Sequence, residues 1–257
     1  MSPFKGNFVW YDLMTTDPKA AEAFYSAVIG WKTADSGLPG MVYTVVSAGE
    51  TGVGGIMALP ADAASAGARP AWSGYIGVND VDATAKALTQ AGGTIHKGPD
   101  DIPGVGRFAA VADPQGAFFY IFKGATDAQP TPQPMGTPGT AGWRELHAGN
   151  WESAFAFYSG LFGWTKAEAM DMGPMGTYQL FAAGGDPIGG MMTKVETIPA
   201  PFWLYYFCVE NIDAAAKRAT DAGGQVLHGP HEVPGGMWIV QCADPQGAAF
   251  AMVGPKL

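Results

Sequence analysis

The sequence contains only two cysteines, Cys208 and Cys242, and they form no CxxC pair. A structural zinc site or a thioredoxin-like redox motif needs closely spaced cysteines, so neither is supported. Both residues lie in apolar, strand-like runs. This setting favours buried, reduced thiols over a disulfide or a reactive thiol.

Basic residues are also few, with 14 lysines and arginines against 23 aspartates and glutamates, for a net charge of -9. An acidic surface repels nucleic acid and anionic membranes, so we expect neither as a partner. No stretch approaches the roughly 20 apolar residues that span a bilayer. The N-terminal residues lack the apolar core and cleavage site of a signal peptide, and we expect a cytoplasmic protein.

Glycine and proline, in contrast, are plentiful, at 37 and 20 residues of 257. They predict many turns and therefore many short strands. Hydrophobic residues make up 47% of the chain and charged residues 14%, which is enough apolar material for a buried core. The length fits one large domain or two of ordinary size.

The chain repeats itself. The segment 10–13 matches 143–146, and the Asp-Pro-Gln-Gly motif at 113–116 recurs at 244–247. Between the copies lies a segment rich in proline and glycine, which predicts an exposed linker. We therefore expect a first domain at 1–123, a linker at 124–140 and a second domain at 141–257.

Each copy predicts the same order of elements. A first helix is capped by Asp17 or Asn150 and ends at Gly30 or Gly163, and Pro18 suits the first turn. A second helix covers roughly 82–90 and 213–221. Apolar strand-like runs flank the helices, and each Asp-Pro-Gln-Gly motif predicts a tight turn between two strands. The pattern is α+β, with two similar halves in each copy.

This order of motifs resembles the vicinal oxygen chelate superfamily, which includes glyoxalase I, the bleomycin-resistance proteins and the extradiol dioxygenases. The matching features are the opening strand, the capped helix at 17–25, Gly30-Trp31, the segments 78–82 and 91–93, and the closing motif at 113–116, all of which recur in the second copy. The resemblance implies two tandem glyoxalase-like domains. Each would consist of two βαβββ modules that form an open eight-stranded cup, with a ligand or metal inside it.

In the metal-using members of that superfamily, a histidine on the first strand and a glutamate on the last strand of a module bind the ion. The corresponding histidine positions here are Trp10 and Trp143, and the glutamate positions are Tyr120 and Ala251. Tryptophan and alanine bind no metal, and tyrosine does so only as a phenolate. The opening strands of the second modules, 72–78 and 203–209, contain no histidine or carboxylate. We therefore expect no metal and no cofactor.

Side chains alternate between the two faces of a strand. If Trp10 or Trp143 faces the cup, the second and fourth residues after it therefore face the cup as well. Tyrosines of the second modules add hydroxyl groups. The predicted ligand-binding residues are Trp10, Asp12, Met14, Tyr75, Tyr120, Trp143, Glu145, His147 and Tyr206.

Three interpretations of Glu145 and His147 remain open. They form a hydrogen-bonded pair at a strand end or face solvent, they form a polar pair that orients a ligand, or they form a catalytic acid–base or irregular metal site.

Other conspicuous residues favour structural roles. Trp31 and Trp164 follow the glycine that ends the first helix and are expected in the core. His96, His228 and His231 lie beside Gly-Pro sequences and are expected in loops. The glycine pairs at 54–55 and 189–190 are typical of a bulge or a close backbone approach rather than of phosphate binding.

Three functions compete. The first is a metal-independent binder of a small aromatic or cationic molecule, of the bleomycin-resistance type. The second is a lyase, isomerase or dioxygenase that uses Glu145 and His147, with a divalent metal at an irregular site. The third is an interaction protein with vestigial cups. Ligand binding that is lost on substitution of Trp143 would support the first function. Turnover after metal addition would support the second. A protein partner whose binding is unaffected by substitutions in the cups would support the third. The two domains are expected to pack on each other within the chain.

Overall fold

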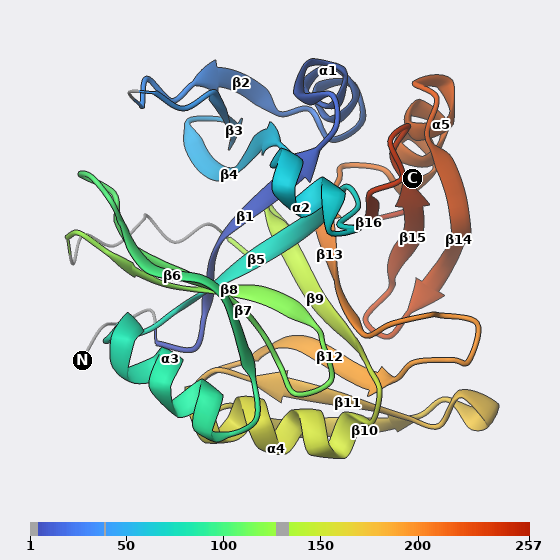
Figure 1. Cartoon of the computed structure of the whole chain (residues 1–257). Coiled ribbons are helices and arrows are strands. Elements are labelled where there is room, and N and C mark those ends of the chain that lie inside the picture. Colours follow the sequence, from blue (N-terminus) through green and yellow to red (C-terminus); the bar gives the residue numbers. More distant parts are fainter. Residues whose placement is uncertain (1–4, 39, 127–133) are drawn as a thin grey trace. The chain divides into compact units, whose positions relative to one another are not determined.

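The fold follows from a computed structural model that describes residues 5–38, 40–126 and 134–257 (Figure 1). The first copy contains β1 (Phe8–Thr15), α1 (Pro18–Ile29), β2 (Lys32–Asp35), β3 (Tyr43–Ala48), β4 (Thr51–Ala58), α2 (Ala61–Ser65), β5 (Ala71–Gly77), α3 (Val81–Gln90), β6 (Thr94–Ile102), β7 (Gly106–Ala112) and β8 (Phe118–Gly124). The second contains β9 (Ala141–Ala148), α4 (Trp151–Phe162), β10 (Thr165–Asp171), the 3-10 turn η1 (Gly173–Met175), β11 (Thr177–Ala182), β12 (Pro187–Thr193), β13 (Phe202–Cys208), α5 (Ile212–Asp221), β14 (Gln225–Val233), β15 (Met237–Ala243) and β16 (Ala249–Gly254).

Each copy supplies one eight-stranded sheet. The strand order is β2-β3-β4-β1-β5-β8-β7-β6 in the first copy and β10-β11-β12-β9-β13-β16-β15-β14 in the second. Within every module the first and last strands pair in parallel, as β1 with β4 and β5 with β8. The pairs β9 with β12 and β13 with β16 repeat this arrangement. The predicted α+β class and βαβββ modules are confirmed.

The first helix of each copy begins and ends where the sequence predicts. Asp17 accepts a hydrogen bond from the backbone N–H of Ala20 at 3.0 Å, and Gly30 adopts a left-handed φ of 89° after the last turn of α1. In α4 the cap is Asn150, and Gly163 has a φ of 75°. Helices α3 and α5 begin one residue earlier than expected, because residues 80 and 211 are their caps.

The described residues cluster into two compact units that do not coincide with the two copies. Unit 1 contains 5–10, 73–126 and 144–203, and unit 2 contains 11–38, 40–72, 134–143 and 204–257. Each unit therefore combines a module of one copy with a module of the other. Helix α3 lies beside α4 in unit 1, and α1 contacts α5 in unit 2 (Figure 1).

The Asp-Pro-Gln-Gly motifs form the predicted tight turns, because the N–H of Gly116 donates to the carbonyl of Asp113 at 3.0 Å. In unit 1 the carboxylate of this aspartate also accepts a hydrogen bond from Tyr158 of the other copy at 3.1 Å. The indole N–H of Trp203 donates to the same hydroxyl. Unit 2 repeats this buried network with Asp244, Tyr25 and Trp72.

The glutamine of the same motif caps the first helix of the opposite copy. In unit 1 the Gln115 Oε1 atom accepts from the N–H of Asn150 at 2.7 Å, and its Nε2 donates to the Asn150 carbonyl at 2.9 Å. In unit 2 Gln246 makes the matching pair of hydrogen bonds to the backbone of Asp17. A turn that is local in the sequence thus ties the two copies together.

Trp31 and Trp164 lie in the core, as predicted. They are only 3% and 1% exposed. The indole N–H of Trp164 donates to the carbonyl of Gly6, and that of Trp31 donates to the carbonyl of Gly139, both at 2.7 Å. Each indole therefore fixes the segment that precedes the opening strand of the other copy.

The loop assignment of the other histidines is wrong. His96 lies in β6, and His228 and His231 lie in β14. Both strands are last in their sheets, and each pairing has register shifts around its Gly-Pro sequence. Edge strands tolerate proline and bulges, so a sequence that usually marks a turn is accommodated within a strand.

Between the copies, β8 ends at Gly124 and β9 begins at Ala141. The central part of the predicted linker, 127–133, lies outside the described residues. Cys208 and Cys242 are buried thiols, as predicted. Among the helices of the described chain, none has both the length and the apolar character needed to cross a membrane.

Candidate functional site

The opening strands separate their residues onto two faces, as strand alternation requires. On β1, Tyr11 and Leu13 belong to the core, and the ring of Tyr11 lies 5.2 Å from that of Tyr205. The predicted residues Trp10, Asp12 and Met14 share the opposite face. On β9 this face carries Trp143, Glu145 and His147. The same alternation therefore holds on both opening strands.

Each of these faces carries a buried carboxylate held by a tyrosine. In unit 2 the Tyr43 hydroxyl donates to Oδ1 of Asp12 at 2.7 Å. In unit 1 the Tyr178 hydroxyl donates to Oε2 of Glu145 at 2.8 Å. The two carboxylate residues are 3% and 7% exposed. We refer to Asp12–Tyr43 and Glu145–Tyr178 as the carboxylate–tyrosine pairs.

The glycine pairs explain how each tyrosine reaches across a strand. Tyr178 lies on β11 and Glu145 on β9, with β12 between them. At the crossing point β12 carries Gly190, which pairs with Glu145, and a Cβ atom there would lie 2.3 Å from the Tyr178 ring. The first copy uses Gly55 for the ring of Tyr43 in the same way. The close approach predicted at the glycine pairs is therefore that of a tyrosine ring to the backbone of Gly55 or Gly190.

The tyrosines of the carboxylate–tyrosine pairs were not predicted from the sequence. A local signal for them exists, because Tyr43 and Tyr178 recur with the same 135-residue offset as the glycine pairs at 54–55 and 189–190. Their contact with the opening strand depends on pairing across three strands, which sequence periodicity does not reveal.

His147 distinguishes the second copy from the first, where Met14 takes its place. Its Nε2 atom lies 2.8 Å from Oε1 of Glu145, yet the N–H direction does not meet the geometry of a hydrogen bond. The imidazole stacks on Phe202, with ring centroids 4.8 Å apart and planes 5° from parallel. The residue is 9% exposed, and among the described residues neither ring nitrogen has a hydrogen-bond partner.

The predicted tyrosines of the second modules are also buried, but they differ between the copies. Tyr75 pairs with Tyr120 in parallel register, and their rings stack with centroids 4.2 Å apart. At the matching place in unit 2, Tyr206 pairs with Ala251. There the neighbouring Gln241 donates through Nε2 to the Tyr206 hydroxyl at 2.8 Å.

The metal positions implied by the family resemblance do not suit an ion. They hold tryptophan on both opening strands, and Tyr120 and Ala251 on the closing strands. Tyr120 is occupied by its stack on Tyr75. Nowhere in the described part of the chain do three or more histidine, cysteine, aspartate or glutamate side chains gather as a metal would require.

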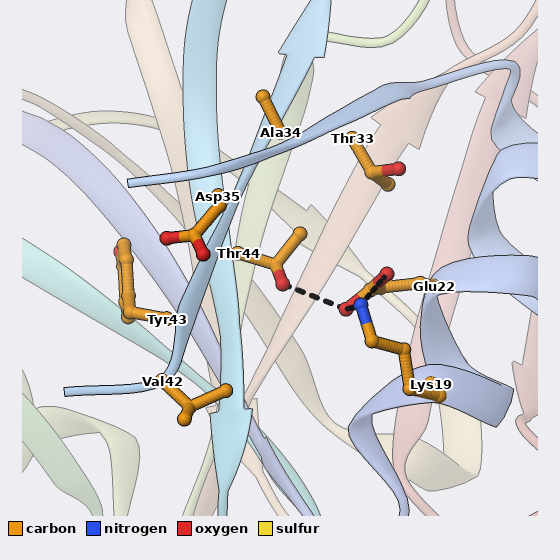
Figure 2. Close-up of a pocket in the computed structure, with 8 residues that line it drawn as sticks. All are labelled: Lys19, Glu22, Thr33, Ala34, Asp35, Val42, Tyr43 and Thr44. Carbon is orange, nitrogen blue, oxygen red and sulfur yellow. Dashed lines mark hydrogen bonds and ion pairs between the residues drawn. The ribbon is translucent and has the colours of Figure 1, made fainter. Parts of the chain in front are cut away.

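A cavity of about 150 Å³ lies beside α1, β2 and β3 in unit 2. Figure 2 shows Glu22 joined to two of its neighbours: Glu22 accepts hydrogen bonds from Thr44 at 2.6 Å and from Lys19 at 2.9 Å. Tyr43 lines this cavity as well as contacting Asp12. Since Glu22 is already paired with Lys19 and Thr44, we regard the carboxylate–tyrosine pairs as the better candidate site.

A family model for the glyoxalase/bleomycin resistance protein/dioxygenase superfamily matches residues 7–121 and 142–252. The chain belongs to this superfamily. One relative is "Putative glyoxylase CFP32" of Mycobacterium tuberculosis, which is 34% identical over 96% of this chain and 94% of its own length. Another is the "Anthracycline biosynthesis protein DnrV" of Streptomyces peucetius, which is 31% identical over 95% of this chain and 91% of its own.

Several solved structures share the fold at low sequence identity. The 2,3-dioxygenase LapB from Pseudomonas sp. KL28 has a TM-score of 0.68 at 12% identity, covering 99% of this chain and 94% of its own. The Mn(II)-bound glyoxalase from Novosphingobium aromaticivorans has a TM-score of 0.65 at 17% identity, covering 98% of this chain and 82% of its own. At these identities the likeness concerns the fold alone.

Proposed function

We propose that this superfamily member binds a small aromatic molecule that carries a positive charge, without a metal at the positions its relatives use. The observation that carries the proposal is the recurrence of a buried carboxylate–tyrosine pair on the opening strand of both copies. Each carboxylate is two residues from a tryptophan, at Trp10 or Trp143.

The chemistry of these groups defines the ligand class. A buried carboxylate attracts a cationic group, and the hydrogen bond from tyrosine holds the carboxylate in one orientation. Indole rings stack on planar or cationic groups. Two relatives are named for the biosynthesis of anthracyclines, which are aromatic compounds.

Isothermal titration calorimetry with doxorubicin, a polycyclic aromatic with one ammonium group, tests the proposal. We expect the wild-type protein to bind and the double variant Asp12→Asn/Glu145→Gln to bind at least about ten-fold more weakly, because hydrogen bonds to charged groups contribute about 1.5–3 kcal/mol. The exposed-acid variant Glu152→Gln serves as the matched control and is expected to bind like wild type. Absence of binding, or equal affinity for the wild-type and double-variant proteins, would refute the proposal.

A second candidate function is catalysis at Glu145 and His147, favoured by the 2.8 Å approach of the imidazole to the carboxylate. A positioned imidazole is a common proton-transfer group in enzymes. Purified protein is assayed for turnover of α-keto hemithioacetals and catechols, before and after addition of divalent metal. Turnover that is lost in His147→Gln supports this candidate, and no turnover in either condition contradicts it.

A further inference from the structure

We propose that His147 selects ligands that carry a hydroxyl group, by accepting a hydrogen bond from it at Nδ1. The inference rests on the proposed function, since it concerns the same ligand and adds a specificity determinant in unit 1. Both nitrogens of the imidazole are buried without a hydrogen-bond partner among the described residues. An unmade buried hydrogen bond is costly, so a ligand that supplies the missing group gains affinity.

The position of Glu145 assigns the roles of the two ring nitrogens. Nε2 lies 2.8 Å from Oε1 of Glu145, where two facing lone pairs would repel each other, so we place the proton of the neutral ring on Nε2 although this N–H does not meet hydrogen-bond geometry. Nδ1 then presents a lone pair and accepts a hydrogen bond. The stack on Phe202 fixes the plane of the ring and therefore the direction of that lone pair.

Three protein groups near the imidazole have another partner or nothing to donate. The Tyr178 hydroxyl gives its proton to Oε2 of Glu145. Met192, the residue paired with His147 on β12, has a thioether that cannot donate. Phe202 contributes only a ring face. The donor to Nδ1 is therefore expected from the ligand.

The neighbouring charges favour a neutral donor for this place. A cationic group on the ligand is drawn to the carboxylate of Glu145, which is a stronger acceptor than a neutral imidazole. A hydroxyl group donates without adding charge, and an aromatic ring that bears one can extend over the same face. The ligand class is therefore an aromatic cation with a hydroxyl group.

The first copy provides an internal comparison. It has the carboxylate–tyrosine pair Asp12–Tyr43, but Met14 replaces the imidazole. The first copy is therefore expected to bind the charged aromatic part of a ligand with the same affinity whether or not the ligand carries a hydroxyl group. Hydroxyl selection should depend on position 147 alone.

The test compares tyramine with 4-methoxyphenethylamine, which has the same charge and ring but no hydroxyl donor, by ligand-observed NMR titration. In the Asp12→Asn background, in which only unit 1 keeps its carboxylate, the protein should prefer tyramine by about ten-fold or more, as expected when a buried acceptor is left unpaired by the analogue. In His147→Met, which copies the first domain, the preference should fall to none. His147→Gln retains an acceptor oxygen and should keep part of the preference for tyramine.

The outcomes separate this inference from the proposed function. Equal binding of both amines by Asp12→Asn, with both weakened when Glu145→Gln is added, would overturn the role of His147 and leave the proposed function intact. Binding of neither amine would overturn both. Thermal unfolding of His147→Met controls for folding, because removal of an unsatisfied imidazole should not destabilise the protein.

Discussion

The hydroxyl of Tyr158, on the first helix of the second copy, lies 3.1 Å from Oδ2 of Asp113 in the closing turn of the first copy. The same hydroxyl accepts a hydrogen bond from the indole N–H of Trp203 at 3.1 Å. A buried tyrosine thus links a helix of one copy to a turn of the other. Tyr25 and Asp244 repeat the link in unit 2.

The first prediction concerns these hydroxyls. Tyr158→Phe removes the hydroxyl that accepts from Trp203 and donates to Asp113. The indole N–H and the carboxylate then stay buried and each lacks this hydrogen bond. We expect a loss of about 1–3 kcal/mol in the free energy of unfolding, measured by urea titration. Tyr25→Phe should cost a similar amount, and a loss below the error of the titration in both variants would contradict the role of the network.

The second prediction concerns pH. Burial raises the pKa of the Asp113 carboxyl above its ordinary value of 3.8, although hydrogen bonds from Ala117, Gln115 and Tyr158 act in the opposite direction. The folded protein therefore holds this proton more tightly than the unfolded chain does. Its contribution to stability is present below pH 3.8 and is lost as the pH rises through the folded-state pKa.

Urea unfolding of the wild-type protein and of Asp113→Asn at a series of pH values isolates this contribution. The stability of wild type relative to the variant should increase as the pH falls from neutrality toward 3.8. A relative stability that decreases over the same range would mean that the pKa is lowered in the folded state.

The third prediction concerns the glycine beneath the Tyr178 ring. A Cβ atom at Gly190 would lie 2.3 Å from that ring, so Gly190→Ala must displace it from Glu145. We expect about 1–3 kcal/mol of destabilisation, from the overpacking. At Gly160, inside α4, a Cβ atom would meet no heavy atom within 4 Å beyond the adjoining helix backbone, so Gly160→Ala should instead stabilise the protein by about 0.5–1 kcal/mol.

Thermal or urea unfolding of both glycine variants checks this pair of opposite effects. A crystal structure of Gly190→Ala would show whether the tyrosine hydroxyl has left the carboxylate. If Gly190→Ala is as stable as wild type and keeps the hydrogen bond, the close approach has no structural role.

The fourth prediction concerns the thiols. Cys208 and Cys242 are buried, and burial raises the pKa of Cys242 to about 12. Because the thiolate is the reactive species, neither cysteine should react with iodoacetamide in the native protein at neutral pH. Mass spectrometry should find both alkylated only after denaturation. Rapid alkylation of the folded protein would contradict their placement in the core.

Local chemistry explains which elements the sequence predicts well. The caps Asp17 and Asn150 and the end glycines Gly30 and Gly163 act within one turn of their helices, so their spacing reveals the helix bounds. The alternation that places Asp12 and Glu145 on the tryptophan-bearing face is likewise a property of a single strand.

Contacts between distant segments were not accessible in this way. The sequence places Gln115 in a turn, but its partner is Asn150 in the other copy. Tyr43 and Tyr178 lie two strands away from the carboxylates that they hold. The Gly-Pro sequence beside His228 suggests a loop, yet the edge of the sheet accommodates it within β14.

Metal dependence of ligand binding tests the central claim most directly. Doxorubicin is titrated into the protein by calorimetry in buffer with EDTA, and again after addition of Mn²⁺ or Fe²⁺. We expect the same affinity in all three conditions, because the positions that the family resemblance assigns to metal ligands hold Trp10, Trp143, Tyr120 and Ala251. Binding that appears only with added metal, or that EDTA abolishes, would contradict the claim.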